Sequence, residues 1–324
     1  MRKLILFGLL ALFTSAAVQV SPVKKLQVSP VKKLKVGKSP TFSAMSPDGR
    51  FLFVTNFASD EVSVVDCMSN KSEKKFYAGY EPLGIVVSPL GDKIFVTNLR
   101  SGLVKVVDAK TYEILDDIKV GGRPTNIAIS PKGQSLFVTN YGRGKIGRVD
   151  VIDASSHRIT KTIEMGVRPI AAVVSPLGDQ LFVVCGGSNE LYVIDVNSLT
   201  VKKQIPVGLS PDGVAITSDG ETLYVSNSGS DDLSVVDLID LQELRRVRVG
   251  QKPFSISVNQ QGHIFVVETG SRTLTILSPD FEKIQSLKLG KKPIDIQLSP
   301  DSRHAYVTDE QDNSVLIFEI TGLS

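Results

Sequence analysis

Basic and aromatic side chains gather in the loop-like stretches between residues 80 and 168. Two tyrosines and five basic residues stand there: Tyr80, Arg100, Arg123, Tyr141, Arg143, Lys145 and Arg168. A guanidinium group offers paired donors to a phosphate or a carboxylate, and a tyrosine ring can stack against a base or a sugar. If the fold brings these side chains to one face, together with Lys252 and Lys292, we predict that they bind an anionic ligand or single-stranded DNA.

Residues that commonly carry catalysis or bind metals are scarce. The chain has three histidines, two cysteines and no tryptophan, and its histidines and cysteines form no cluster along the sequence. The spacings of zinc fingers, haem-attachment motifs and iron–sulfur sites are therefore missing. We predict no catalytic residue, no metal ligand and no cofactor.

A Gly-x-x-Pro motif recurs seven times and divides most of the chain into similar units. Its prolines lie 40 to 45 residues apart: Pro40, Pro82, Pro124, Pro169, Pro211, Pro253 and Pro293. Six residues beyond each proline a hairpin-turn sequence begins, such as Ser46–Gly49, in which proline presets the turn and glycine accepts a positive φ. An apolar segment, a polar loop and two further β-type segments follow each turn. Four short antiparallel strands in each of seven units predict an all-β fold, a seven-bladed β-propeller that forms one domain.

The apolar segment after each turn carries a recognisable signature. It reads Phe-Val-Thr-Asn in the first three units, beginning with Phe53–Asn56. With seven in-phase copies from Gly37 to the C-terminus, the chain resembles the YVTN-repeat β-propellers, the YncE-like proteins. The resemblance implies an exported or surface protein, and YncE-like members are associated with DNA binding. We expect the asparagine to cap a turn, and three units replace it: Cys185, Glu268 and Asp309.

The last unit is incomplete and the N-terminal segment matches the missing part. Only Ile320 to Ser324 follow its third strand, so it lacks a fourth, whereas Val31–Gly37 matches the fourth strand of the sixth unit, Ile284–Gly290. We therefore predict that an N-terminal strand closes the last blade and removes the open sheet edges. An octapeptide duplication offers two copies for this place, Val20–Gln27 and Val28–Lys35, and we expect the second because it adjoins the first unit.

The N-terminus has the three-part order of a secretory signal peptide. Basic Arg2 and Lys3 precede an apolar run from Leu4 to Phe13, and small residues lead to Ala17. We predict cleavage after Ala17 and an exported protein in the periplasm, at the cell surface or outside the cell. The apolar run falls short of the roughly 20 residues that span a bilayer, so no transmembrane segment is predicted. The expected organisation is a signal peptide at 1–17, an N-terminal arm at 18–30 and the propeller at 31–324.

Antiparallel strands sort the loops of a propeller onto two ends. We call the end with the Gly-x-x-Pro motifs and the loops between second and third strands the top, and the end with the hairpin turns the bottom. The residues before the seven prolines should ring the top: Ser39, Glu81, Arg123, Arg168, Ser210, Lys252 and Lys292. The second to fourth blades then carry the basic side chains, and the loops of other blades are acidic: Asp60, Glu61, Asp231, Asp232, Glu310 and Asp312.

The same sorting places all three histidines, His157, His263 and His304, at the bottom. A catalytic triad or a histidine metal site at the top therefore has no histidine to use. Cys67 falls at the bottom of one blade and Cys185 at the top of another, so we expect no disulfide and a Cys185 that packs as a small hydrophobic residue.

These observations favour binding over catalysis. The net charge of +3 is too small for a surface that attracts nucleic acid as a whole. We predict an exported, monomeric, non-catalytic scaffold whose partner is an anionic ligand, single-stranded DNA or an envelope protein. The alternative is a propeller enzyme such as a lactonase or another hydrolase, and the simplest interpretation of the arginines is a solvated rim.

Overall fold

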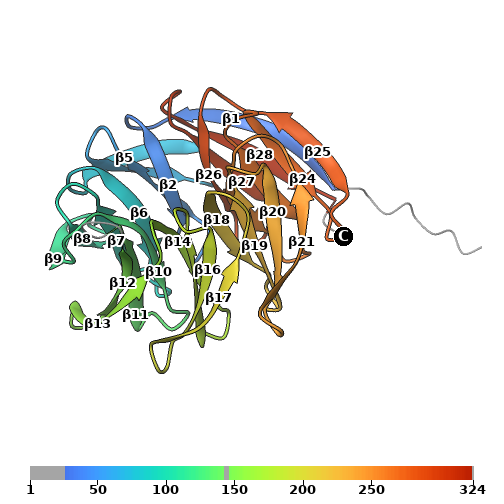
Figure 1. Cartoon of the computed structure of the whole chain (residues 1–324). Coiled ribbons are helices and arrows are strands. Elements are labelled where there is room, and N and C mark those ends of the chain that lie inside the picture. Colours follow the sequence, from blue (N-terminus) through green and yellow to red (C-terminus); the bar gives the residue numbers. More distant parts are fainter. Residues whose placement is uncertain (1–25, 142–145, 323–324) are drawn as a thin grey trace, which may run out of the picture.

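The computed structural model describes residues 26–141 and 146–322, and in these ranges the chain is built from strands alone. The strands form seven four-stranded antiparallel sheets around a central axis (Figure 1). The innermost strand of each sheet lies against that of the next, and the last lies against the first. The prediction of a seven-bladed β-propeller is confirmed. Within the described ranges, no helix is long and apolar enough to cross a membrane.

In each of the first four blades, the strands follow one another along the chain from the innermost to the outermost strand. Blade 1 contains β2 (Pro40–Met45), β3 (Phe51–Asn56), β4 (Glu61–Asp66) and β5 (Lys71–Tyr77), and blade 2 contains β6 (Pro82–Val87), β7 (Lys93–Asn98), β8 (Leu103–Asp108) and β9 (Ile114–Lys119). Blade 3 contains β10 (Pro124–Ile129), β11 (Ser135–Asn140), β12 (Gly147–Asp153) and β13 (Arg158–Met165), and blade 4 contains β14 (Pro169–Val174), β15 (Gln180–Cys185), β16 (Glu190–Asp195) and β17 (Thr200–Pro206).

The remaining blades complete the ring. Blade 5 contains β18 (Pro211–Ile216), β19 (Thr222–Asn227), β20 (Asp232–Asp237) and β21 (Gln242–Arg248), and blade 6 contains β22 (Pro253–Val258), β23 (Ile264–Glu268), β24 (Thr273–Leu277) and β25 (Lys283–Lys288). Blade 7 contains β26 (Pro293–Leu298), β27 (His304–Asp309), β28 (Ser314–Thr321) and, as its outer strand, the N-terminal β1 (Gln27–Lys35).

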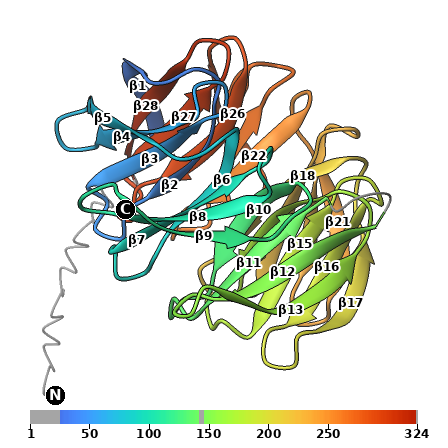
Figure 2. The ribbon, with the colours of Figure 1, turned by 90° about the vertical axis from the view of Figure 1, so that its left-hand side faces the viewer.

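The N-terminal strand closes the last blade as predicted, and Figure 2 shows it in blue beside the red strands of the C-terminal end. β1 pairs antiparallel with β28, from Gln27 opposite Thr321 to Lys35 opposite Ser314. The second octapeptide copy occupies this place. The strand begins four residues before the expected propeller boundary at Val31, because β28 extends to Thr321 and Val28 is buried between blades 6 and 7. Residues 20–25 of the first copy and the predicted signal peptide lie outside the described residues.

The repeated signature has a physical meaning at each position. Its aromatic residues fill the space between neighbouring blades and are almost completely buried: Phe53, Phe95, Phe137, Phe182, Tyr224, Phe265 and Tyr306. Its threonine joins blades, because the hydroxyl of Thr97 donates to the carbonyl of Thr125 in the next inner strand at 3.1 Å. Thr55 does the same for blade 2 at 2.8 Å and Thr308 for blade 1 at 2.7 Å. The aromatic residue and the threonine of the signature therefore attach one blade to the next.

The asparagines of the signature have two kinds of partner. In blades 1, 2 and 5 the amides of Asn56, Asn98 and Asn227 donate within the same blade, whereas in blade 3 the asparagine holds the segment that enters the blade. In blade 3 the Asn140 side-chain oxygen accepts the Arg123 N–H at 2.8 Å and its amide donates to the Gly121 carbonyl at 2.8 Å. Glu268 keeps the same function in blade 6, because its carboxylate accepts the Gly250 N–H at 2.7 Å. The glycine of Gly-x-x-Pro leaves room for this side chain, and a Cβ on Gly37 would overlap the side chain of Asn56.

Both cysteines are free thiols in separate blades. Cys185 is completely buried in the core between blades 3 and 4, as expected for a packed hydrophobic residue. Burial raises the pKa of the Cys185 thiol to about 12, so the thiol stays protonated at neutral pH.

Candidate anion-binding site

The residues that precede the seven prolines occupy equivalent places at the top of the ring. In every blade the carbonyl of this residue accepts the N–H of the residue that follows the Phe-Val-Thr-Asn signature, for example Tyr141 to Arg123 at 3.1 Å and Gly186 to Arg168 at 2.8 Å. Five of the seven adopt a positive φ: Ser39, Glu81, Arg168, Ser210 and Lys252. The structure therefore places these side chains in the predicted ring.

Arg123, Tyr141 and Arg168 form one group across blades 3 and 4, which we call the arginine cluster. The backbones of Arg123 and Tyr141 are joined by the hydrogen bond just described, and the Arg168 guanidinium lies 6.0 Å from the centre of the Tyr141 ring. Both arginine side chains are exposed and make no ion pair with another described residue. Arg143 and Lys145 of the same predicted sector fall at 142–145, outside the described residues.

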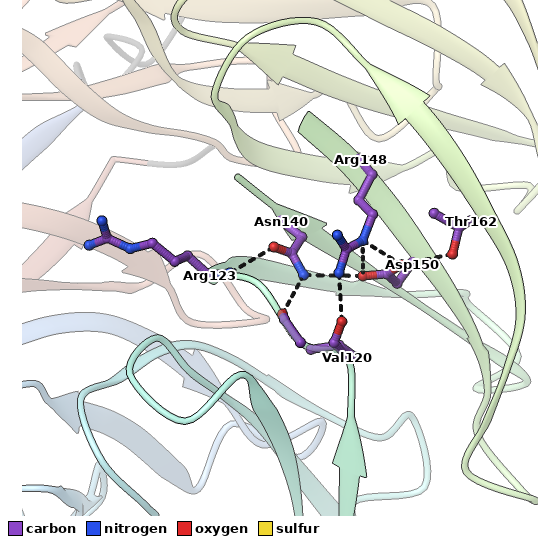
Figure 3. Close-up of polar contacts among 7 residues, drawn as sticks. Val120, Arg123, Asn140, Arg148, Asp150 and Thr162 are labelled. Atoms are coloured by element: carbon purple, nitrogen blue, oxygen red, sulfur yellow. Dashed lines mark hydrogen bonds and ion pairs between the residues drawn. The ribbon is translucent and has the colours of Figure 1, made fainter. Parts of the chain in front are cut away.

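A buried polar network beneath Arg123 fixes its backbone (Figure 3). Asp150 on β12 is 1% exposed, and its two oxygens lie 3.0 Å from the Arg148 Nε. The Asn140 amide and the Thr162 hydroxyl donate to the same carboxylate at 3.2 and 2.9 Å. In Figure 3 the Arg123 side chain extends away from this network, and its guanidinium group is not part of it.

Sequence reasoning missed Arg148 and Asp150. The Arg148 Nη2 donates to the Val120 carbonyl at 2.6 Å, which ties β12 to the strand end that precedes Arg123. The available signal was that blade 3 has the longest spacing between prolines and that Arg-x-Asp occurs in its third strand alone among the repeats.

Arg168 also faces a carboxyl group in the next blade. Asp212 follows Pro211 on β18, and burial raises the pKa of its carboxyl, while a hydrogen bond with Ser228 and the positive charge of Arg168 act in the opposite direction. Asp212 lines the central cavity of the ring. Arg168 therefore contacts the Tyr141 ring and also acts through its charge on Asp212.

The remaining predicted site residues do not join the arginine cluster through any contact among described residues. Lys292 forms an ion pair with Glu310 at 2.5 Å, and its role in ligand binding stays a prediction. Arg100 and Lys252 are exposed without an ion pair to a described residue. Tyr80 packs edge-on against Tyr77, with ring centres 6.1 Å apart.

Several acidic residues that we expected to make the other loops negative have structural partners. The Asp60 carboxylate accepts the Glu81 N–H at 2.9 Å, and the Asp231 carboxylate accepts the Lys252 N–H at 2.8 Å. These bonds fix the ring residue of the following blade, which explains an acidic or amide side chain at this loop position.

The histidines are at the bottom, as predicted. His263 and His304 stand beside hairpin turns, and His157 Nδ1 lies 2.7 Å from a carboxylate oxygen of Asp116 in blade 2. Among the described residues, no group of three or more His, Cys, Asp and Glu side chains is placed to hold a metal ion.

Comparison with known proteins identifies a family, and many solved structures are similar to this chain. The model of the cytochrome D1 heme domain family matches residues 9–216. No curated protein matches the sequence. A chain of hydrazine synthase from Kuenenia stuttgartiensis superposes with a TM-score of 0.81 over 88% of this chain and 97% of that chain. At 22% sequence identity this similarity concerns the propeller fold.

Proposed function

The chain belongs to the cytochrome D1 heme domain family, and from this premise we propose that it is an exported β-propeller that binds an anionic ligand through the arginine cluster. The observation that carries the proposal is that Arg123 contacts Tyr141 through its backbone and Arg168 through its guanidinium, while both arginine side chains are exposed and neither makes an ion pair with a described residue. Like charges that are brought together repel, and an anion between them removes this repulsion.

Within the family, the repeat signature supports a place among the YVTN-repeat propellers of the YncE-like type. The basic, apolar and small-residue order of residues 1–17 supports export. Both features favour a binding protein of the cell envelope or the exterior. The arginine cluster suits a ligand that carries phosphate or carboxylate groups, because a guanidinium group binds either of them through a pair of hydrogen bonds.

The test is to replace Arg123 and Arg168 together by glutamate. We propose to measure the affinity of the mature chain for phosphate, for citrate and for an oligothymidylate of about 15 nucleotides, the upper end of the site size of a single-strand-binding module. Binding by the wild type and its loss in R123E/R168E are expected. If the ligand is single-stranded DNA, the affinity falls with salt at a slope of about −0.7 per phosphate contacted.

A matched control reverses the same number of charges at the bottom. Arg158 and Arg303 are exposed and make no ion pair with a described residue, so R158E/R303E changes the net charge equally without touching the arginine cluster. This variant should bind like the wild type. Equal loss in both variants, or no binding of any probe by the wild type, would leave the arginine cluster as a solvated rim.

A further inference from the structure

The centre of the ring contains a cavity of about 330 Å³ between the seven inner strands. Its wall is mostly Ala, Val and Ile, with the rings of Phe42 and Phe254 stacked at 6.4 Å. Its polar groups include Asn126, Asp212 and Asp295. The chain belongs to a family of haem domains. We nevertheless infer that this cavity binds no haem and that the residues of its wall hold the ring together.

The wall lacks the side chains that bind haem iron. The protein ligands of haem iron are histidine, cysteine, methionine and tyrosine. None of these types lines the cavity among the described residues. The sulfur atoms of Met45 and Cys67 lie 3.8 Å from each other in blade 1 and do not line the cavity, and the histidines lie at the bottom of the ring.

The charge of the wall also opposes a haem, which carries carboxylate substituents. The only ionisable groups among the described residues that line the cavity are two carboxyls, those of Asp212 and Asp295. Burial raises the pKa of both, which means that a negative charge is already unfavourable in this place. A second set of carboxylates would add repulsion and desolvation cost.

Asp295 has a structural partner in each neighbouring blade. One carboxylate oxygen accepts the Ser43 N–H at 2.9 Å and the Ser43 hydroxyl at 2.8 Å, and the other accepts the Ser255 hydroxyl at 2.9 Å. Ser43 belongs to blade 1 and Ser255 to blade 6, so this carboxyl joins three blades at the point where the ring closes. Where β1 closes blade 7 from outside, Asp295 closes it from inside.

The inner strands leave little freedom for the wall to open. Gly84 and Gly213 stand on β6 and β18, and a Cβ on either would overlap the backbone of the next inner strand, at Asn126 and Phe254 respectively. Neighbouring inner strands are therefore in backbone contact at these points, and a large planar ligand would have to separate them.

The inference is tested on the full mature chain with iron protoporphyrin IX and with haem d1. We expect the absorption spectrum of either compound to stay that of the free compound and the unfolding temperature to stay unchanged, because a ligand that binds the native state raises this temperature. Binding of the haem carboxylates to the arginine cluster is separated from binding in the cavity by repeating the titration with R123E/R168E. A spectral change that disappears in this variant comes from the rim and leaves the inference standing.

The inference is overturned by one result. This result is a change in the haem absorption spectrum that saturates at one haem per chain, persists in R123E/R168E and has the low-spin form caused by an axial side-chain ligand. Such a result would leave the proposed anion site untouched, because the two sites share no residue.

Discussion

At the scale of single residues, the candidate site depends on a buried network that supports an exposed charge. Asp150 is the centre of this network, since Arg148, Asn140 and Thr162 all donate to its carboxylate. Asn140 in turn accepts the Arg123 N–H, so the position of the surface arginine depends on side chains that never reach the surface.

The substitution Asp150→Asn should destabilise the fold and weaken ligand binding together. It removes the negative charge beside Arg148 and replaces one acceptor oxygen by an NH2 donor that faces other donors, and a hydrogen bond to a charged group contributes about 1.5–3 kcal/mol. Thr162→Val is the matched control, because it removes one donor and leaves the pair of Asp150 and Arg148 in place, so it should cost less stability than D150N. Urea unfolding of both variants measures the difference. Equal stabilities of D150N and the wild type would mean that the network does not hold Arg123 in place.

Single-residue partners were the part of the site that the sequence could not predict. The repeat places Lys292 and Arg168 at equivalent ring positions, yet Lys292 pairs with Glu310 while Arg168 lies over Tyr141. The backbone position of each side chain follows from the period of the repeat. Its partner depends on the rotamer and on a side chain from another loop, and neither follows that period.

At the scale of elements, the closure of the ring was predictable and its bounds were not. The match between Val31–Gly37 and a complete fourth strand identified β1, because the other six units contain a fourth strand and the last unit lacks one. The strand nevertheless begins at Gln27, since β28 is long enough to pair with four further residues.

Removal of residues 18–36 from the mature chain should open the ring. The truncation deletes the buried side chains of Val28 and Leu34 and uncovers the core residues they pack against, and burial of one such side chain contributes roughly 1.5–3 kcal/mol. The lost strand pairing adds to this cost, which is large beside a total stability of about 5–15 kcal/mol. The exposed edge of β28 should also promote association. Thermal unfolding and light scattering measure both effects.

A shorter truncation is the control for this experiment. Removal of residues 18–25 leaves β1 intact and should not change the unfolding temperature. The closure would be without energetic importance if the longer truncation melted within about 1 °C of the chain that begins at residue 18, which corresponds to less than about 1 kcal/mol in a domain of this size.

At the scale of the whole molecule, the aspartates of the bottom have partners in their own turns, whereas the arginine cluster of the top makes no ion pair with a described residue. The bottom carries aspartates at the ends of the third strands, such as Asp66, Asp153 and Asp195, whose carboxylates accept N–H groups of the following turn. The pKa of each carboxyl is lowered, mainly by the Ser69 N–H for Asp66, by the Ser155 hydroxyl for Asp153 and by the Lys202 ammonium for Asp195. An anion is attracted to the top by the arginine cluster, whose guanidinium groups make no ion pair with a described residue.

Hydrogen exchange of the mature chain with and without a bound anionic probe tests this account most directly. The account predicts slower exchange in peptides that cover residues 121–124, 141 and 166–169, with no change in the bottom turns at 46–50 and 153–158. The same probe should cause no change in R123E/R168E. Slower exchange confined to the bottom turns, or to the inner strands that surround the central cavity, would contradict a binding site at the arginine cluster.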